Sequence, residues 1–410
     1  MSLSDISIDR DAIMKRVKVI AITLAFTFVL LAFTAQPVAA ASRYDSLRSY
    51  MDSRYDAVRG GYTIPGEGVT RIDPTYGAIT IMSEVGTINN RPPPVTIPMV
   101  MDFVVTHQWL NEETEPRYGG FSDYLLGPIT IGSNYRALRT WEILMAQSDI
   151  PGTEDYSINA TANLIWINKT QTASGGFGFE NDRSPDLLST AYALMSIRLI
   201  DTLYPLENAW NWLHNETATV EWIESCKNGV AYMLNPDSDR VGVTATAAAV
   251  LAYKALDPVA AVPDTANLLS WLSSRQIMDY EVPEFIGGFE EANGSVEPNL
   301  LSTYYGLKAM DTLATLSTVN ITAAESFILN CQSMDGSFAI APGFSTGKLI
   351  YSGYACEILS MAEFGGALNI LSSSADPNSP GGTGFEWRTL VIIGIVGIAL
   401  VLAILAVRRD

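Results

Sequence analysis

The sequence predicts an all-α protein built from six helix pairs. A Gly-Gly-aromatic stretch recurs about every 50 to 60 residues, and each copy precedes a segment whose apolar residues have helical spacing. A sixth copy keeps only its second helix, from Val243 to Lys254. The other five copies are Gly60-Gly61-Tyr62, Gly119-Gly120-Phe121, Gly175-Gly176-Phe177, Gly287-Gly288-Phe289 and the variant Asp335-Gly336-Ser337-Phe338.

Each repeat is predicted to contain a helix, a tight turn, a polar loop and a second helix. Glycine lets the chain reverse tightly, and the aromatic side chain is expected to fill the seam between neighbouring pairs. In the third repeat, the apolar residues from Leu188 to Leu199 fall on one helical face. The predicted pairs are 42–56 with 74–86, 97–111 with 131–147, 155–168 with 185–203, 219–234 with 241–256, 264–276 with 298–314, and 320–332 with 346–363.

Three prolines, Pro74, Pro185 and Pro298, are predicted to begin second helices. Proline suits the first helical position because its missing N–H would be unpaired there anyway. Asp73 and Ser184 are the expected caps. A phosphate-binding loop is the functional alternative for residues 175–178, but they lack a preceding strand and a Gly-Lys-Ser/Thr ending.

The repeats favour a closed ring over an open stack. Open stacks of repeats usually need polar capping repeats at both ends. Here the last repeat keeps the motif, and the first lacks only the phenylalanine, which Tyr62 replaces.

The two ends of the chain indicate membrane targeting. Residues 1–41 place basic residues before an apolar run and an Ala-rich site, which is typical of a signal peptide or, alternatively, of an uncleaved N-terminal anchor. Residues 371–387 form a Ser/Gly/Pro-rich linker. Residues 388–407 are predicted to be a transmembrane helix, and Arg408-Arg409 assign the tail 408–410 to the cytoplasm. The domain at 42–370 is therefore expected to be extracellular, on a single-pass protein of the cell membrane.

Composition limits the possible partners. Five Asn-x-Ser/Thr sequons agree with an extracellular glycoprotein: Asn159, Asn168, Asn215, Asn293 and Asn320. The net charge of −19 argues against nucleic acid as a partner. Three cysteines, Cys226, Cys331 and Cys356, are too few for a disulfide framework and are expected to be small buried hydrophobes.

At these residues the chain resembles the prenyltransferase and squalene-cyclase repeat family. The family pattern places Gln a few residues before Gly-Gly-Phe, as Gln171 does here, and follows it with an acidic loop and a helix like that at 185–194. Gln332 before 335–338 also fits. The resemblance covers about 42–365. It implies an α/α toroid, in which six inner helices form a barrel inside six outer ones.

The catalytic signatures of that family are missing. The resemblance would imply zinc held by Asp, Cys and His near the inner-helix starts, but Ser189 or Ser302 stands where the zinc His would align. The two histidines, His107 and His214, are placed elsewhere. An Asp-x-Asp-Asp acid and a Gly-Cys-Gly-Glu-Gln thioester run are also lacking, and residues 237–240 are read as a solvated loop. No cofactor and no metal are expected.

Aromatic residues on the predicted inner helices are the candidate pocket. In the family such residues line an apolar cavity for isoprenoid chains, whereas plain core packing is the alternative for any single one. The candidates are Tyr76, Tyr135, Trp141, Tyr192, Tyr253, Tyr304, Tyr305, Tyr351 and Tyr354.

Three functions remain open on the sequence. The favoured one is a membrane-anchored, non-catalytic binding module for an isoprenoid, lipid or other apolar ligand. The second is an enzyme acting on isoprenoid or lipid. The third is a carbohydrate-active α/α barrel, which needs two carboxylates roughly 5–10 Å apart. The candidates for that pair are Glu180, Asp182, Asp186, Glu290, Glu291 and Glu297.

Overall fold

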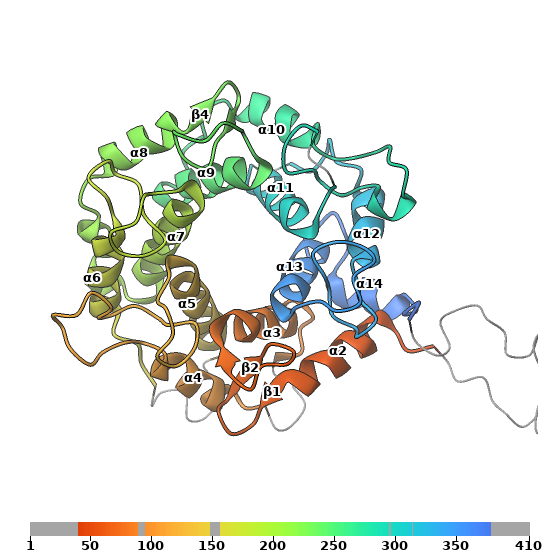
Figure 1. Ribbon diagram of the computed structural model, residues 1–410, viewed down its shortest axis with the longest axis horizontal. Helices are drawn as coiled ribbons and strands as arrows, with labels where there is room; N and C mark the ends of the chain where they lie inside the picture. The colour runs from red at the N-terminus through yellow and green to blue at the C-terminus, as the bar shows by residue number, and fades with distance from the viewer. Residues whose placement is uncertain (1–39, 89–94, 148–155, 295–296, 314, 379–410) are drawn as a thin grey trace, which may run out of the picture. The chain divides into compact units, whose positions relative to one another are not determined.

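Six helices stand side by side around a common axis and form a closed inner ring (Figure 1). Each contacts the next along the chain, and the last contacts the first. They are α3 (Ile72–Glu84), α5 (Ile131–Met145), α7 (Leu187–Leu203), α9 (Val243–Leu256), α11 (Leu300–Thr312) and α13 (Leu349–Leu359). The structure is a computed structural model that describes residues 40–88, 95–147, 156–294, 297–313 and 315–378.

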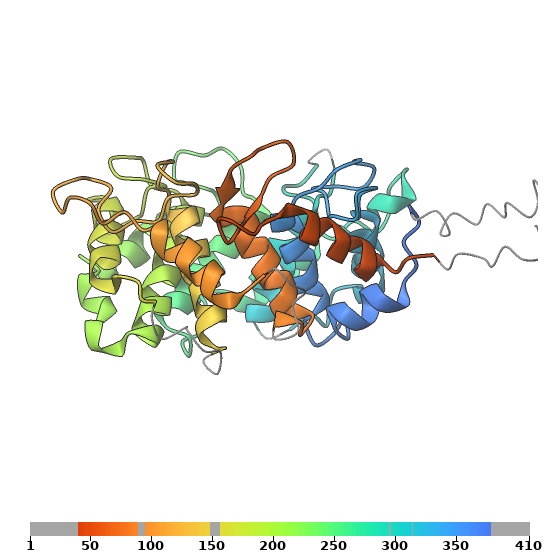
Figure 2. The ribbon, with the colours of Figure 1, turned by 90° about the horizontal axis from the view of Figure 1, so that it is seen from below.

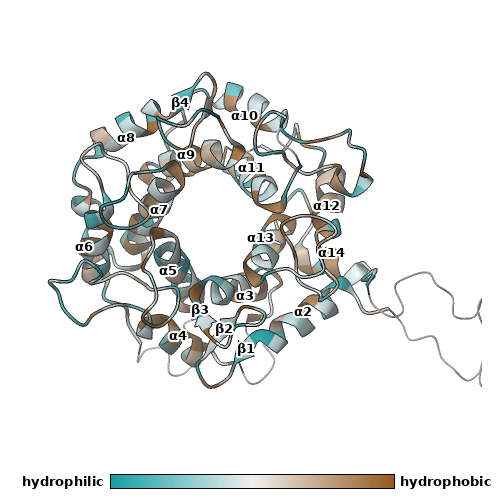
Figure 3. Ribbon diagram, viewed as in Figure 1, coloured by the Kyte–Doolittle hydropathy of each residue, from teal (hydrophilic) through white to brown (hydrophobic). Residues whose placement is uncertain are grey.

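A second set of helices surrounds this ring. The outer helices are α2 (Arg43–Arg54), α4 (Ile97–Thr106), α6 (Ala160–Thr170), α8 (Glu216–Ser225), α10 (Thr265–Ser273) and α12 (Ile321–Asn330). Hydrophobic residues concentrate where the two layers face each other (Figure 3). The longer loops gather on one face of the ring (Figure 2). The α/α toroid is therefore confirmed, with all six predicted pairs present.

Some short elements were not predicted. An extra helix, α14 (Ala367–Ser373), packs on α2 and α13 and occupies the beginning of the expected linker. The strands β1 (Tyr55–Asp56), β2 (Gly61–Thr63) and β3 (Thr70–Arg71) form one antiparallel sheet, and β4 (Lys227–Asn228) pairs with β5 (Ala231–Tyr232). Single 3₁₀ turns, η2 (Pro205–Glu207), η3 (Ala209–Trp212) and η4 (Pro283–Phe285), complete the connections.

The two glycines of each turn allow close contact with the next outer helix. Gly175 has φ +98, and a Cβ there would lie 2.3 Å from the Ala218 carbonyl oxygen in α8. A Cβ on Gly176 would lie 2.5 Å from the ring of Trp222. The glycines therefore serve the packing between repeats as well as the turn.

The aromatic residue of each turn is buried and held by the inner helix. Phe177 is 1% exposed, and its amide donates to Thr190 Oγ1 at 3.0 Å. Thr or Ser does the same for four further repeats, at Thr75, Thr246, Thr303 and Ser352.

The predicted helix caps were wrong in detail. Asp186 caps α7, so Pro185 and Ser184 precede the cap, and Asn299 caps α11 directly after Pro298. Pro74 is the third residue of α3. In both α7 and α11, an Asx side chain after the proline accepts from a first-turn amide, which proline cannot do.

Other expectations concern burial and the membrane. The three cysteines are all buried. No helix in the described part of the chain is long and apolar enough to cross a membrane. The expected transmembrane segment 388–407 and the signal segment up to residue 39 lie outside the described residues.

Candidate functional site

Six of the nine predicted aromatic residues meet at the centre of the ring. Tyr135 stacks on Tyr192 with ring centroids 5.0 Å apart, and Tyr304 stacks on Tyr354 at 4.2 Å. The hydroxyls of Tyr192 and Tyr305 are 2.5 Å apart. Tyr76, the sixth, lines the same central space.

This cluster fills the ring instead of lining an apolar hollow. The residual cavity among these tyrosines is ≈ 30 Å³, about the volume of one water molecule. Among the described residues, the space between these tyrosines is therefore far smaller than the predicted cavity. The rings stack on one another, and charged side chains from the inner helices occupy the remaining space.

An ion pair lies beside the tyrosines. The Glu357 carboxylate accepts from Tyr304 Oη at 3.0 Å and from Lys308 Nζ at 2.5 Å. Burial alone would raise the pKa of Glu357, but Lys308 and then Arg139 outweigh it and hold that pKa below its usual range. The centre of the ring thus places a charged pair beside the tyrosine hydroxyls.

Two predicted pocket residues do not reach the centre. Trp141 is 1% exposed and donates from Nε1 to Tyr204 Oη at 2.9 Å. Tyr253 donates to Glu224 on α8. Both side chains therefore point away from the ring axis. Only a narrow part of each inner helix faces that axis, so apolar residues beside it contact other elements.

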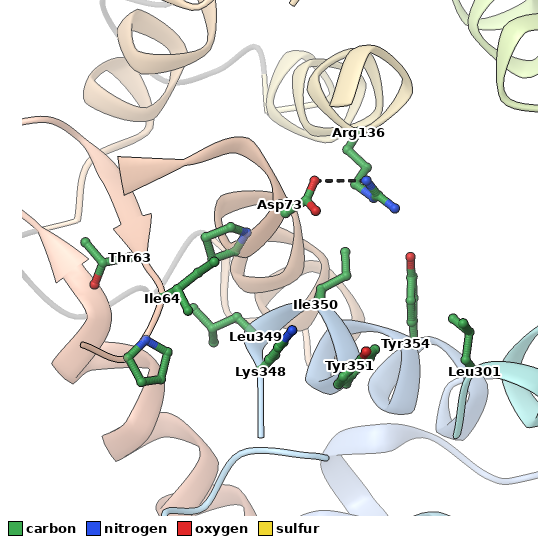
Figure 4. Close-up of a pocket in the computed structure, with 12 residues that line it drawn as sticks. Thr63, Ile64, Asp73, Arg136, Leu301, Lys348, Leu349, Ile350, Tyr351 and Tyr354 are labelled. Carbon is green, nitrogen blue, oxygen red and sulfur yellow. Dashed lines mark hydrogen bonds and ion pairs between the residues drawn. The ribbon is translucent and has the colours of Figure 1, made fainter. Parts of the chain in front are cut away.

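A second pocket, which shares Arg136 and Tyr354 with the central cluster, opens between α3 and α13, where the ring closes (Figure 4). Its cavity measures ≈ 240 Å³. We call it the seam pocket, and its lining residues are Thr63, Ile64, Pro65, Asp73, Pro74, Arg136, Leu301, Lys348, Leu349, Ile350, Tyr351 and Tyr354. Of the predicted residues, Tyr351 and Tyr354 belong to it.

The walls of the seam pocket combine apolar surface with two cations. Ile64, Leu349 and Ile350 supply apolar contact. Lys348 is exposed at the rim, with Nζ 5.8 Å from the centroid of the Tyr351 ring. Arg136 Nη1 pairs with Asp73 Oδ1 at 2.9 Å, and its buried Nε has no hydrogen-bond partner in the described part of the chain.

The first amide of α13 is also unpaired. In the other five inner helices, the first amide donates to a carbonyl of a neighbouring loop; these donors are Ile72, Ile131, Leu187, Val243 and Leu300. Among the described residues, the Leu349 amide has no such acceptor, and the α13 N-cap residue, Lys348, makes no side-chain cap. A helix start with free amides favours negative charge.

Sequence reasoning missed Asp73, Arg136 and Lys348 as members of one site. They come from α3, α5 and the start of α13, so no local motif joins them. Burial raises the pKa of the Asp73 carboxyl, and the Arg136 guanidinium opposes that rise. The only sequence signal was their shared place near inner-helix starts.

Ser189 and Ser302, the two candidates for the position of the family's zinc-binding His, both make structural hydrogen bonds here. Ser189 Oγ donates to Asp186 Oδ2 at 2.6 Å, and Ser302 Oγ donates to the Phe289 carbonyl at 3.0 Å. His107 is buried, and Nδ1 lies 2.6 Å from the Phe103 carbonyl oxygen. Within the described ranges, no group of three or more His, Cys, Asp or Glu residues could hold a metal ion.

Most of the candidate loop carboxylates have structural partners. Glu180 pairs with Arg183 at 2.8 Å, and Glu290 pairs with Arg275 at 3.0 Å. Asp186 caps α7, and Glu291 accepts from Thr244 at the start of α9. Asp182 and Glu297 remain exposed on loops. Four of the six candidates therefore have structural roles in the described part of the chain.

The comparisons with known proteins decide the family. The model of the prenyltransferase alpha-alpha toroid domain matches residues 95–211 and 210–370, which is more than half of the chain. The chain belongs to the prenyltransferase α/α toroid family. No curated protein sequence matches this toroid protein.

Two solved structures are similar to this toroid. Protein geranylgeranyltransferase-I of Candida albicans, complexed with GGPP, has a TM-score of 0.59 and 16% identity, covering 77% of this chain and 90% of that one. The apo type II terpene cyclase MstE from Scytonema has a TM-score of 0.45 and 10% identity, covering 78% of this chain and 98% of that one. The similarity to the geranylgeranyltransferase shows a shared fold only.

Proposed function

We propose that this toroid is a non-catalytic binding module that takes one end of an amphipathic anion in the seam pocket. The observation that carries this proposal is the pocket's composition: apolar walls, the exposed Lys348, an Arg136–Asp73 ion pair, and a helix-start amide with no acceptor among the described residues. Ligand pockets combine mostly apolar lining with a few convergent polar groups. At ≈ 240 Å³ the seam pocket is smaller than most, so it holds part of a ligand.

The chemistry of the pocket favours an isoprenoid or acyl chain that ends in carboxylate or phosphate. The chain would lie on Ile64 and Ile350, and its anionic group would meet Lys348 and the Leu349 amide. A relative of the same fold is described as complexed with GGPP, which supports an isoprenoid as one candidate. Each CH₂ group of the ligand that is buried contributes about 0.8 kcal/mol. After the costs of ordering the ligand, we expect a dissociation constant of roughly 10–1000 µM.

The non-catalytic part of the proposal rests on residue identity. Ser189 or Ser302 stands where the family's zinc His would align, and both serines are already engaged in hydrogen bonds. Burial raises the pKa of the Cys226 thiol to about 12, so thiolate chemistry is disfavoured there.

The location is also a proposal. The basic and apolar N-terminus and the apolar stretch 388–407 support a single-pass membrane protein whose toroid faces outward. Such a module would bind its ligand outside the cell.

Titration of a dansyl-labelled medium-chain fatty acid into the toroid tests the binding. We expect saturable fluorescence enhancement with the unmodified protein. Lys348→Met should bind about tenfold more weakly because a charge-assisted hydrogen bond is lost. Ile350→Trp should abolish binding because the larger side chain fills the pocket. Lys169→Met is the matched control, since Lys169 is exposed on the outer helix α6. Saturable binding that none of these variants weakens would reject the seam pocket.

A further inference from the structure

The five sequons occupy different structural environments. Asn168 lies in the last turns of α6, half-buried, and its Nδ2 donates to the Trp212 carbonyl at 2.6 Å. Its partner Thr170 is 2% exposed and donates to the Ile167 carbonyl at 2.7 Å. A glycan on Asn168 would have to fit beside the Trp212 carbonyl that Nδ2 contacts and leave from a half-buried, packed surface.

Asn215 and Asn320 are exposed at the starts of outer helices. They are the N-caps of α8 and α12, and their Oδ1 atoms accept from Ala218 and Ala323, each at 3.0 Å. Their Nδ2 groups have no hydrogen-bond partner in the part of the chain that the structure describes. The hydroxyl residues of these two sequons, Thr217 and Thr322, are exposed as well.

We propose that Asn215 and Asn320 carry N-linked glycans and that Asn168 does not. Transfer from a lipid-linked oligosaccharide diphosphate forms a bond between Nδ2 and the anomeric carbon of the sugar. The bond from that carbon to the phosphate oxygen breaks, the lipid diphosphate leaves, and one Nδ2 proton is lost. The amide oxygen is untouched, so each helix keeps its cap.

The other two sequons are less suitable acceptors. Asn159 also caps a helix, α6, and differs from Asn215 and Asn320 in its hydroxyl residue: Thr161 of its sequon is only partly exposed and donates to Glu207 at 2.6 Å. The sequon at Asn293 continues into residues outside the described ranges. Neither enters the proposal.

The inference rests on the proposed outward orientation of the toroid. Glycopeptide mass spectrometry on the full chain, produced in a host whose secretory pathway glycosylates Asn-x-Thr, tests it. We expect glycans on Asn215 and Asn320. Thr217→Ala and Thr322→Ala should each remove one glycan without changing a cap, and Asn168→Gln should change no glycan.

A glycan on Asn168, or an unoccupied Asn215 or Asn320, would overturn the assignment. Protease added to intact cells separates the two possible reasons for missing glycans. Digestion of a toroid without glycans contradicts the glycan assignment alone. Protection from the protease contradicts the outward orientation, and the glycan proposal falls with it.

Discussion

Gly77 of α3 and Gly353 of α13 face each other where the ring closes. A Cβ on Gly353 would lie 3.1 Å from the Gly77 Cα, and a Cβ on Gly77 would lie 2.3 Å from the Leu349 carbonyl oxygen. The first and last inner helices thus approach backbone to backbone, which only glycine permits at this separation.

Gly77→Ala should therefore destabilise the ring. Because the clash is with backbone atoms, we expect the free energy of unfolding to fall by about 2–3 kcal/mol. Gly68→Ala, before β3, is the control, since a Cβ there would meet nothing within 4 Å. Urea unfolding monitored by circular dichroism measures both. Equal effects, or a stabilised Gly77→Ala, would contradict this account of closure.

Gln332 links the last repeat to the first. Its Nε2 donates to the carbonyls of Arg43 and Gly336, each at 3.0 Å, and its Oε1 accepts from Arg43 Nη1 at 3.0 Å. Gln332→Ala removes these three hydrogen bonds, so we expect a loss of about 2–4 kcal/mol in unfolding free energy. Gln147, which follows α5 and is partly exposed, is the control position. A loss below about 0.5 kcal/mol at Gln332 would contradict the link.

The central tyrosines should behave as core residues. Tyr192→Ala and Tyr304→Ala should each cost about 3–5 kcal/mol in unfolding free energy, because the packed rings leave cavities when truncated. Tyr351→Ala should cost much less, because Tyr351 is partly exposed in the seam pocket. Thermal melts and denaturant titrations of the three variants measure these losses of stability. Full tolerance of Tyr192→Ala and Tyr304→Ala would indicate a hollow centre.

Glu357 should make the fold sensitive to acid. Its pKa is lowered in the folded state, so the stability it contributes is present above the unfolded value of about 4.3 and is lost as the pH falls through the folded value. The stability difference between the unmodified protein and Glu357→Gln should therefore shrink below about pH 4.

Asp73 should show the opposite pH dependence of stability and serves as the comparison for Glu357. Its pKa is raised in the folded state, so protonation favours folding, and the advantage of the unmodified protein over Asp73→Asn should grow as the pH falls toward about 3.9. Denaturant titrations between about pH 3 and 7 give both curves. If the stability differences of the two variants from the unmodified protein changed with pH in the same direction, the opposite pKa shifts of Glu357 and Asp73 would be contradicted.

The repeat pattern predicted six helix pairs and favoured a closed ring, and the family resemblance implied the α/α toroid. The glycine, aromatic and glutamine positions recur because each serves the same junction, as Gly175, Phe177 and Gln171 do for the third repeat. The caps were misplaced by one or two residues, because Asp186 follows Pro185 and sequence alone does not show which polar residue accepts the amide.

The site was harder to predict from the sequence. Periodicity indicated which helices hold the tyrosines, but it does not give the space that remains among them. Whether six rings enclose a hollow depends on their rotamers and on charges such as Lys308 and Glu357, which come from different helices. The seam pocket unites residues from the first, second and last repeats, and only ring closure brings them together.

Amide hydrogen exchange at the start of α13 tests the central claim most directly. The Leu349 amide has no acceptor among the described residues and should exchange quickly. Saturating decanoate or geranyl phosphate should slow exchange in peptides covering 347–352. Separate titrations with the two ligands distinguish an acyl carboxylate from an isoprenoid phosphate. Unchanged exchange at 347–352 together with protection confined to the central segments of α7 and α11 would place the ligand among the tyrosines and contradict the seam pocket.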